Sequence, residues 1–390
     1  MRLPTRLDRY PAKMVSTLAD RLIERYALGA RRLLDPFCGS GAILVAAQHR
    51  GIPVTGIDIN PVADVFCRVK LNGFRPEAAR RLAARWIEHA EKAEKRSPVV
   101  WPSKSYWFTP ATMEKFERLR GASAAVHLAE TDEGMAVLMS YVLAVRLCSR
   151  ADQRSPKPFI SKQARFSRKG RHFDPCRVIL DVLDELGGLY GVRKDRSPWR
   201  LLRADVPNAA AVVGELGSHS HIVTSPPYIN AQDYFRNFKL ELYLLEGVLP
   251  YRVTDIRERF IGTERGNLLG GVARDALDEN LDILPELEQL QRRDSRLAGV
   301  VHRYLDEMRR SFDAVTPCLP RGGRFVLVCG DNLVGGLRIP TWRALQYLLE
   351  RKGLRLFDRF ADKIGDRLLA PKRHGHRGLI KQEMILAFSN

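Results

Sequence analysis

The feature that most constrains the fold is a strand, a glycine turn, a helix and a second strand in direct succession. A short apolar run ends in the sequence DPFCGSG at 35–41, an apolar helical stretch follows, and a second apolar run ends at Asp58. Glycines let the backbone turn sharply and approach a ligand closely. An acid at the tip of the second strand can accept hydrogen bonds from both hydroxyls of a ribose. The unit predicts a parallel α/β sheet, and the alternative for the turn alone is an ordinary strand-to-helix connection.

A second constraint is the sequence TSPPY at 224–228, which directly follows the apolar run 221–223. Neither proline can donate a backbone N–H, so a central strand has to end there and the carbonyls before each ring point out of the sheet edge. A serine hydroxyl, free carbonyls and a tyrosine ring suit a flat heterocycle that carries an amino group. Taken alone, the five residues fit a proline-rich turn equally well.

The rest of the chain alternates further strands with helices. Apolar runs at 199–205, 325–331, 354–357 and 383–388 bring the expected strands to seven, and the third ends in Asp205. The sequence therefore predicts a doubly wound, Rossmann-like seven-stranded α/β sheet. Its expected domain comprises residues 1–61 and 198–390, with residues 62–197 as a mostly helical insertion. The motifs all end one of the first four strands, so they are expected along one rim of the sheet, where such folds bind ligands.

The charge of the chain points to a polyanionic partner. The formal net charge is +19 and the isoelectric point is near 9.9, and such an excess of cations attracts nucleic acid and drives counterion release from it. Between residues 150 and 171 stand eight lysines or arginines against one acid, together with two phenylalanines. This basic loop predicts nucleic-acid contact, with a solvated surface loop as the alternative. Its candidate DNA-binding residues are Lys162, Arg165, Arg168 and Lys169.

Composition also argues against several classes of protein. The six cysteines are scattered without a CxxC pair, which predicts reduced thiols and neither a metal site nor a disulfide framework. No apolar run reaches the roughly 18 residues that a membrane helix needs, and the N-terminus carries no apolar signal core. We therefore expect a cytoplasmic protein without a membrane partner.

The two motifs together resemble those of the amino-group DNA methyltransferases that use S-adenosylmethionine. DPFCGSG is similar to their FxGxG cofactor motif, TSPPY is similar to their (D/N/S)PP(Y/F) catalytic motif, and YPAKM at 10–14 is similar to the segment that helps to hold the methionine end of the cofactor. The resemblance implies the catalytic residues Ser225, Pro226, Pro227 and Tyr228. It implies S-adenosylmethionine contacts from Tyr10, Pro11, Asp35, Phe37, Cys38, Gly39, Gly41, Asp58 and Asp205.

The resemblance also implies a substrate and a mechanism. Serine at the first position of the catalytic motif is typical of enzymes that methylate the N4 amine of cytosine, whereas aspartate or asparagine is more typical of adenine N6. The order of motifs is similar to that of the alpha group, so residues 62–197 would read double-stranded DNA, and a cognate restriction endonuclease is a possible functional partner. Ser225 and Pro226 would orient the amine, and Tyr228 would stack on a flipped-out base.

Other readings stay open. Adenine N6 methylation is the variant within the same family, and an RNA base methyltransferase is a second reading because the Pro-Pro-aromatic motif also serves RNA enzymes. A noncatalytic nucleic-acid-binding protein that retains the fold is a third. Cysteine-based methylation of cytosine carbon 5 is disfavoured because Cys176 and Cys318, although each follows a proline, do not follow the fourth strand.

Overall fold

The computed structural model describes residues 14–93, 96–153, 157–160, 173–191, 197–229, 234–263, 272, 274–363 and 382–390. The chain divides into two compact units, and each is described by itself. The sheet unit comprises Ala12–Ile59, Ser197–Tyr234 and Glu258–Asn390, and the helical unit comprises Met1–Pro11, Asn60–Arg196 and Phe235–Arg257.

A seven-stranded sheet forms the centre of the sheet unit and confirms the predicted fold class. Its strand order is β3-β2-β1-β4-β5-β9-β8, and β9 alone runs antiparallel to its two neighbours. The order reverses between β1 and β4, which is where open α/β sheets bind ligands. This is a Rossmann-like α/β fold. The strands are β1 (Leu33–Asp35), β2 (Val54–Asp58), β3 (Trp199–Arg203), β4 (His221–Thr224), β5 (Arg324–Gly330), β8 (Arg355–Lys363) and β9 (Gln382–Ser389).

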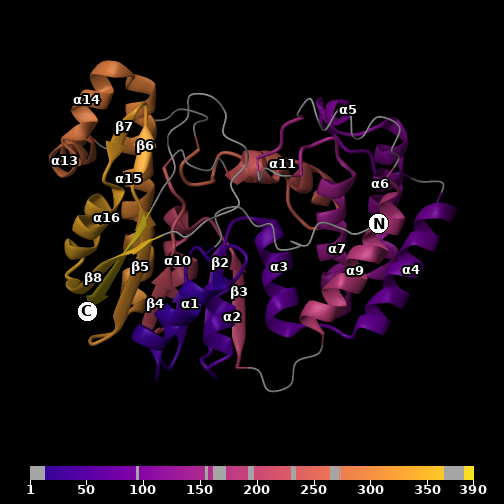
Figure 1. The fold of residues 1–390 in the computed structure, drawn as a ribbon, viewed down its shortest axis with the longest axis horizontal. Helices are drawn as coiled ribbons and strands as arrows, with labels where there is room; N and C mark the ends of the chain where they lie inside the picture. The colour runs from indigo at the N-terminus through magenta and orange to yellow at the C-terminus, as the bar shows by residue number, and fades with distance from the viewer. Residues whose placement is uncertain are drawn as a thin grey trace. The chain divides into compact units, whose positions relative to one another are not determined.

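Apolar side chains that alternate along the central strands build the core of this unit. Leu34, Ile222 and Phe325 are fully buried and belong to one cluster with Leu305 and Phe312 of α15 (Ser295–Val315). Side chains two apart on a strand share a face, so this alternation fixes which face receives α15. Figure 1 shows α15 and α16 running alongside β5. Further helices are α1 (Ser16–Leu22), α2 (Ala42–Gln48), α10 (Ala210–Gly214), α13 (Arg274–Ile283), α14 (Glu286–Arg293) and α16 (Thr341–Glu350).

Several element ends differ from the sequence expectation. The fourth strand ends at Thr224, directly before the SPPY motif, and its two prolines cannot donate backbone hydrogen bonds to continue the strand. The third strand ends at Arg203, so Asp205 lies two residues beyond it. A two-stranded hairpin of β6 (Asn332–Val334) and β7 (Leu337–Ile339) was not predicted, because each strand is only three residues long.

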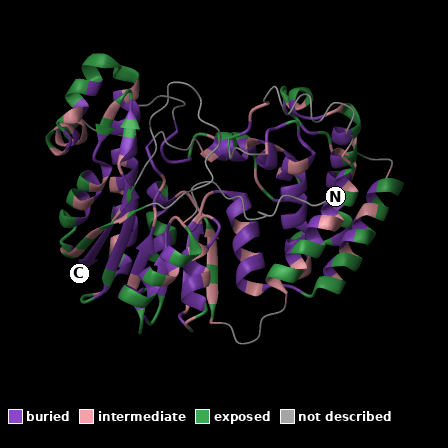
Figure 2. Cartoon of the chain, in the orientation of Figure 1, coloured by how far each residue is buried: buried purple, intermediate pink, exposed green. Residues whose placement is uncertain are grey.

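The helical unit packs around α7 (Asp132–Cys148), which is buried on nearly every side (Figure 2). Its Tyr141 ring meets Trp86 and Phe116 edge-on, at centroid distances of 5.5 and 5.6 Å. The sequence of α7 is almost uniformly apolar because a helix that is buried on all sides needs no polar face. Its neighbours are α3 (Pro61–Asn72), α4 (Pro76–Lys92), α5 (Lys104–Trp107), α6 (Pro110–Ala122) and α9 (Pro175–Tyr190).

Residues 235–257 belong to the helical unit. They contain most of α11 (Tyr234–Leu245) and all of α12 (Val253–Ile256). The Tyr141 hydroxyl donates to the carbonyl oxygen of Leu244 at 3.0 Å, and the guanidinium of Arg120 donates to the carbonyl oxygen of Glu246. Buried polar groups need such partners, so these two bonds hold the end of α11 within the helical unit.

Among the residues that the structure describes, none of the helices combines the length and the apolarity that crossing a bilayer requires.

Candidate active site

The carboxyl ends of β1 and β4 are joined by a buried hydrogen bond. The Thr224 hydroxyl donates to the Asp35 carboxylate at 2.6 Å, and the Phe37 backbone N–H donates to the same carboxylate at 3.1 Å. Thr224 is fully buried and Asp35 is 3% exposed. The two strands pair in parallel with Leu34 opposite Ile222, so their ends reach the same edge. The bond therefore holds the start of the glycine turn against the start of the SPPY motif.

Burial raises the pKa of Asp35 to about 7, although the hydrogen bonds from Thr224 and Phe37 oppose the shift and the nearby Asp58 charge adds to it. A carboxyl with a raised pKa binds its proton more tightly in the folded than in the unfolded chain. Its contribution to stability is therefore greatest near pH 4 and is lost as the pH rises towards 7.

We expect Asp35→Asn to remove this pH dependence. The amide keeps an oxygen acceptor for Thr224 and Phe37 but does not titrate, whereas wild-type protein should lose about 2 kcal/mol of unfolding free energy between pH 5 and 8 from this group. Denaturant unfolding of both proteins at the two pH values measures the difference. An equal decline in both proteins would show that Asp35 titrates normally.

The glycine turn lies against the carboxyl end of β2. The Gly39 N–H donates to the Asp58 carboxylate at 2.9 Å, and the Cys38 N–H donates to the Ile57 carbonyl oxygen at 3.0 Å. Gly39 and Gly41 have φ of 49° and 81°, in the left-handed region that favours glycine. Gly39 therefore places backbone without a side chain directly beside the Asp58 carboxylate.

Close packing of α2 on the sheet fixes the position of this turn. A Cβ atom built on Gly56 of β2 would lie 2.6 Å from Leu44 Cδ1 and 2.9 Å from Leu201 Cδ2. Only glycine leaves room for Leu44 there. The missing side chain lets α2 approach β2, and α2 begins where the turn ends.

Tyr228 connects the SPPY motif, which follows β4, to β9, which lies two strands away in the sheet. Its hydroxyl donates to the Glu383 carboxylate on β9 at 2.8 Å, and the two residues are 6% and 8% exposed. Because β9 runs antiparallel, its first residues reach the edge where β5 ends, and Glu383 pairs with Gly330 there. Burial and the Glu383 charge raise the pKa of Tyr228 well above its usual value, while a hydrogen bond with Ser225 opposes the shift. Tyr228 is thus a neutral, fixed donor.

The backbone after the motif is held from two sides. The Asn332 side chain donates to the Ile229 carbonyl oxygen at 2.8 Å and accepts from the Thr341 hydroxyl at 2.9 Å. Gly262 has φ of 75°, and a Cβ atom there would lie 3.1 Å from the Tyr228 carbonyl oxygen. These contacts lock the motif before the chain leaves the sheet.

Tyr234, the first residue of α11, also lies at this edge. Burial raises the pKa of its hydroxyl, and the negative charges of Asp58 and Glu383 add to the shift. The ring is half-buried. Tyr234 therefore lies close enough to the ends of both β2 and β9 for their carboxylates to affect it.

Asp205 lies two residues beyond the edge strand β3, next to Ala204, whose backbone N–H donates to the Asp58 carbonyl oxygen at 3.2 Å. Its carboxylate accepts from the Asn208 side chain at 2.7 Å. Burial raises the pKa of Asp205, while that hydrogen bond and the positive charges of Arg259, Arg310 and Arg303 oppose the rise. Its described partners thus link it to the turn that follows β3.

The structure brings together most of the residues that the sequence singled out. Asp35 and Thr224, Gly39 and Asp58, and Tyr228 and Ser225 are linked directly at the carboxyl edge of the sheet. Sequence reasoning assigned no role to Thr224, Tyr234 or Glu383. A lone acid at the start of an otherwise apolar last strand was the available signal for Glu383. The predicted contacts Tyr10, Pro11, Lys162, Arg165, Arg168 and Lys169 lie outside the described residues.

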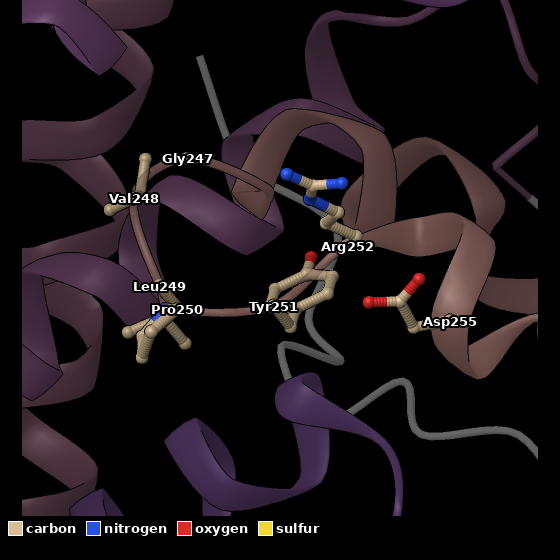
Figure 3. Close-up of a pocket in the computed structure, with 7 residues that line it drawn as sticks. All are labelled: Gly247, Val248, Leu249, Pro250, Tyr251, Arg252 and Asp255. Carbon is tan, nitrogen blue, oxygen red and sulfur yellow. The ribbon is translucent and has the colours of Figure 1, made fainter.

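A separate hollow of about 530 Å³ lies in the helical unit, on the loop between α11 and α12 (Figure 3). Its lining runs from Gly247 to Arg252 and includes Asp255. None of these residues belongs to the motifs at the sheet edge. The hollow is therefore a surface feature of one loop and not part of the candidate active site.

Comparison with known proteins gives relatives of one kind. M.BsoBI of Geobacillus stearothermophilus is 25% identical over 296 residues, which cover 64% of this chain and 54% of that protein. M.AvaI of Nostoc sp. is 25% identical over 311 residues, covering 70% and 60%. Both are named type II methyltransferases. The chain is similar to type II methyltransferases. It spans between half and three-fifths of the length of these two relatives.

Two further comparisons are weaker. The type II methyltransferase M.MvaI of Kocuria varians is 36% identical, but only over 75 residues, or 18% of this chain and 16% of that protein. Among solved structures, the rRNA methyltransferase aviRa of Streptomyces viridochromogenes aligns over 98% of this chain and 87% of its own, with 15% identity and a TM-score of 0.31. No protein-family model matches the chain.

Proposed function

We propose that the chain is an S-adenosylmethionine-dependent DNA methyltransferase that methylates the N4 amine of a flipped-out cytosine. The observation that carries the proposal is the Thr224–Asp35 hydrogen bond. It joins the strand that leads into the glycine turn to the strand that leads into SPPY. A cofactor held by the first motif would therefore face the residues of the second. The similarity to type II methyltransferases supports DNA as the substrate.

The residues at the ends of β1 and β2 fit S-adenosylmethionine. Gly39 and Gly41 have positive φ and no side chain, so the backbone can approach a ligand at these two positions. Asp58 is fixed by the Gly39 N–H and presents a carboxylate suited to ribose hydroxyls. Phe37 and Cys38 complete the turn between Asp35 and Gly39. When bound, S-adenosylmethionine supplies a methyl group activated by a positively charged sulfur.

Ser225 and Pro226 would orient the nucleophile. The lone pair of an exocyclic amine is delocalised into its ring, which makes the amine a weak nucleophile. Hydrogen bonds from the amine to the Ser225 hydroxyl oxygen and the Pro226 carbonyl oxygen favour a more tetrahedral nitrogen and direct its lone pair. Pro227 prevents the strand from continuing and leaves the Pro226 carbonyl outside the ladder.

Tyr228 would form the wall against which the flipped base rests. The base has to leave the duplex because its amine cannot be reached within it. The Glu383 bond keeps the Tyr228 ring in one orientation, and a fixed wall limits the positions that a base can adopt. This preorganisation is the form of catalysis that the described residues can provide.

Adenine N6 methylation is the alternative within the same mechanism, since only Ser225 distinguishes the two substrates in our reading. RNA base methylation is a further alternative, because splayed-out bases in RNA present the same flat amines. A cognate restriction endonuclease is part of the proposal only through the type II names of the relatives.

Transfer of a labelled methyl group tests the substrate class. Purified protein with methyl-labelled S-adenosylmethionine is expected to label duplex DNA of mixed sequence and to leave ribosomal RNA unlabelled. Tyr228→Ala serves as the catalytic control and should abolish the label. Labelled RNA with unlabelled DNA would contradict the proposal.

A further inference from the structure

The exposed side of α11 within the helical unit consists of two cations and one aromatic residue. Most of the helix is buried, including Phe235, Phe238 and Leu242. Within the helical unit, the residues of α11 left at least partly accessible are Arg236, Lys239 and Tyr243. They are three and four positions apart, so they lie along one face of the helix. In Figure 2, α11 accordingly has an exposed and a buried side.

Two residues of this face contact an aromatic segment around α5. The Lys239 ammonium lies 4.3 Å from the centroid of the Trp107 ring, and the Tyr243 ring stacks on Trp101 at 4.7 Å with an interplanar angle of 5°. A cation over an indole keeps its charge and loses freedom of movement. Lys239 is therefore a fixed positive charge that remains partly open to solvent.

The segment around α5 adds another cation and an open ring. Tyr106 is 49% exposed and meets Trp107 edge-on at 4.9 Å. The Arg150 guanidinium is exposed and donates to the Ser105 carbonyl oxygen at 2.9 Å, while its backbone N–H donates to the Trp107 carbonyl oxygen at 2.8 Å. A carbonyl fixes a guanidinium without neutralising it. Arg150 is also the first residue of the basic loop identified in the sequence.

An acid of the same helix points away from this face. Glu241 is 6% exposed, and its carboxylate lies 3.9 Å from the buried Arg146 guanidinium. Glu241 thus faces the buried Arg146, although the Lys239 charge also acts to lower the pKa of this carboxyl. We define the α11 patch as Tyr106, Arg150, Arg236 and Lys239.

We propose that the α11 patch is a DNA-contact surface of the helical unit, with its three cations on backbone phosphates and Tyr106 on a sugar or base. This inference rests on the proposed function for its choice of DNA. Fixed, exposed cations interleaved with aromatic rings are the features that nucleic acid recognises. The net charge of +19 favours a polyanion over a protein partner. Two of its residues, Arg236 and Lys239, follow the SPPY motif in the sequence, and the other two, Tyr106 and Arg150, precede it.

The test compares two double variants that remove the same charge from the same unit. Arg236→Gln with Lys239→Gln removes two cations of the patch. Arg81→Gln with Arg85→Gln removes two exposed cations of α4, for which the described residues provide no ion pair. Binding of a fluorescent 30-base-pair duplex is followed by anisotropy across a range of salt concentrations. Lys239→Arg keeps both the charge and the stacking on Trp107 and serves as the conservative variant.

We expect the patch variant to bind duplex DNA about tenfold more weakly and to lower the slope of log K against log salt by about 2, since each phosphate contact contributes about 0.9. The α4 variant and Lys239→Arg should match wild type. Equal salt slopes in wild type and the patch variant would overturn the proposal that the α11 patch contacts DNA. An equal loss of DNA affinity in both double variants would do the same. Wild-type protein that binds no duplex DNA would instead overturn the proposed function and the patch with it.

Discussion

Glu383→Ala is expected to slow methyl transfer by about 10- to 100-fold while S-adenosylmethionine binds as in wild type. The substitution leaves the buried Tyr228 hydroxyl without the acceptor that it has at 2.8 Å, and an unsatisfied buried hydroxyl costs about 1–3 kcal/mol. The loss should fall on the catalytic motif, because β9 carries no residue of the glycine turn. Single-turnover transfer and calorimetric cofactor binding measure the two effects separately.

Two companion variants separate positioning from general damage to the fold. Glu383→Gln keeps an oxygen acceptor and should recover most of the transfer rate. Adding Tyr228→Phe to Glu383→Ala removes the orphaned hydroxyl, so the double variant should regain stability without regaining full activity. Wild-type transfer rates in Glu383→Ala would show that the tether plays no part in catalysis.

Asp58→Ala is expected to weaken S-adenosylmethionine binding by about 1–3 kcal/mol, or about 5- to 150-fold. The carboxylate that would accept from the ribose hydroxyls is lost, and charge-assisted hydrogen bonds have that magnitude. Asp58→Asn keeps an acceptor for the Gly39 N–H and should show an intermediate loss. Calorimetric titration with the cofactor measures all three proteins.

A matched control for this experiment is Asp205→Ala. Asp205 lies two residues beyond the neighbouring strand β3, and its described hydrogen-bond partner is Asn208. The structure links Asp58 and not Asp205 to the glycine turn, so the Asp205 variant should lose less affinity than Asp58→Ala. Unchanged affinity in Asp58→Ala would remove this residue from the cofactor site.

Local signals in the sequence predicted the sheet edge well. Glycine and proline determine the backbone conformation of their immediate neighbours, so their effect can be read from a short stretch of sequence. The structure places the glycine turn, Asp58 and the two prolines at strand ends, as expected. The partnership of Tyr228 with Glu383 spans 155 residues. Nothing local specifies it, because it depends on β9 running antiparallel beside β5. Such long-range contacts follow from topology and cannot be read from a motif.

The unit to which α11 belongs cannot be read from the sequence for a related reason. The spacing of apolar residues predicts a helix with one buried face, but it does not state which unit receives that face. The deciding contact is a hydroxyl of Tyr141 on a carbonyl of Leu244, 103 residues apart. The α11 patch could not be predicted from the sequence either, because Lys239 and Trp107 are far apart in the chain and come into contact only in the folded protein.

The most direct test of the proposed activity is the identity of the methylated base. Genomic duplex DNA is incubated with the protein and methyl-labelled S-adenosylmethionine, digested to nucleosides and analysed by mass spectrometry. We expect labelled N4-methylcytosine, because Ser225 is the first residue of the motif and Tyr228 is held in place by Glu383. Labelled N6-methyladenine alone would contradict the cytosine assignment, and no labelled nucleoside at all would contradict the proposed DNA methyltransferase activity.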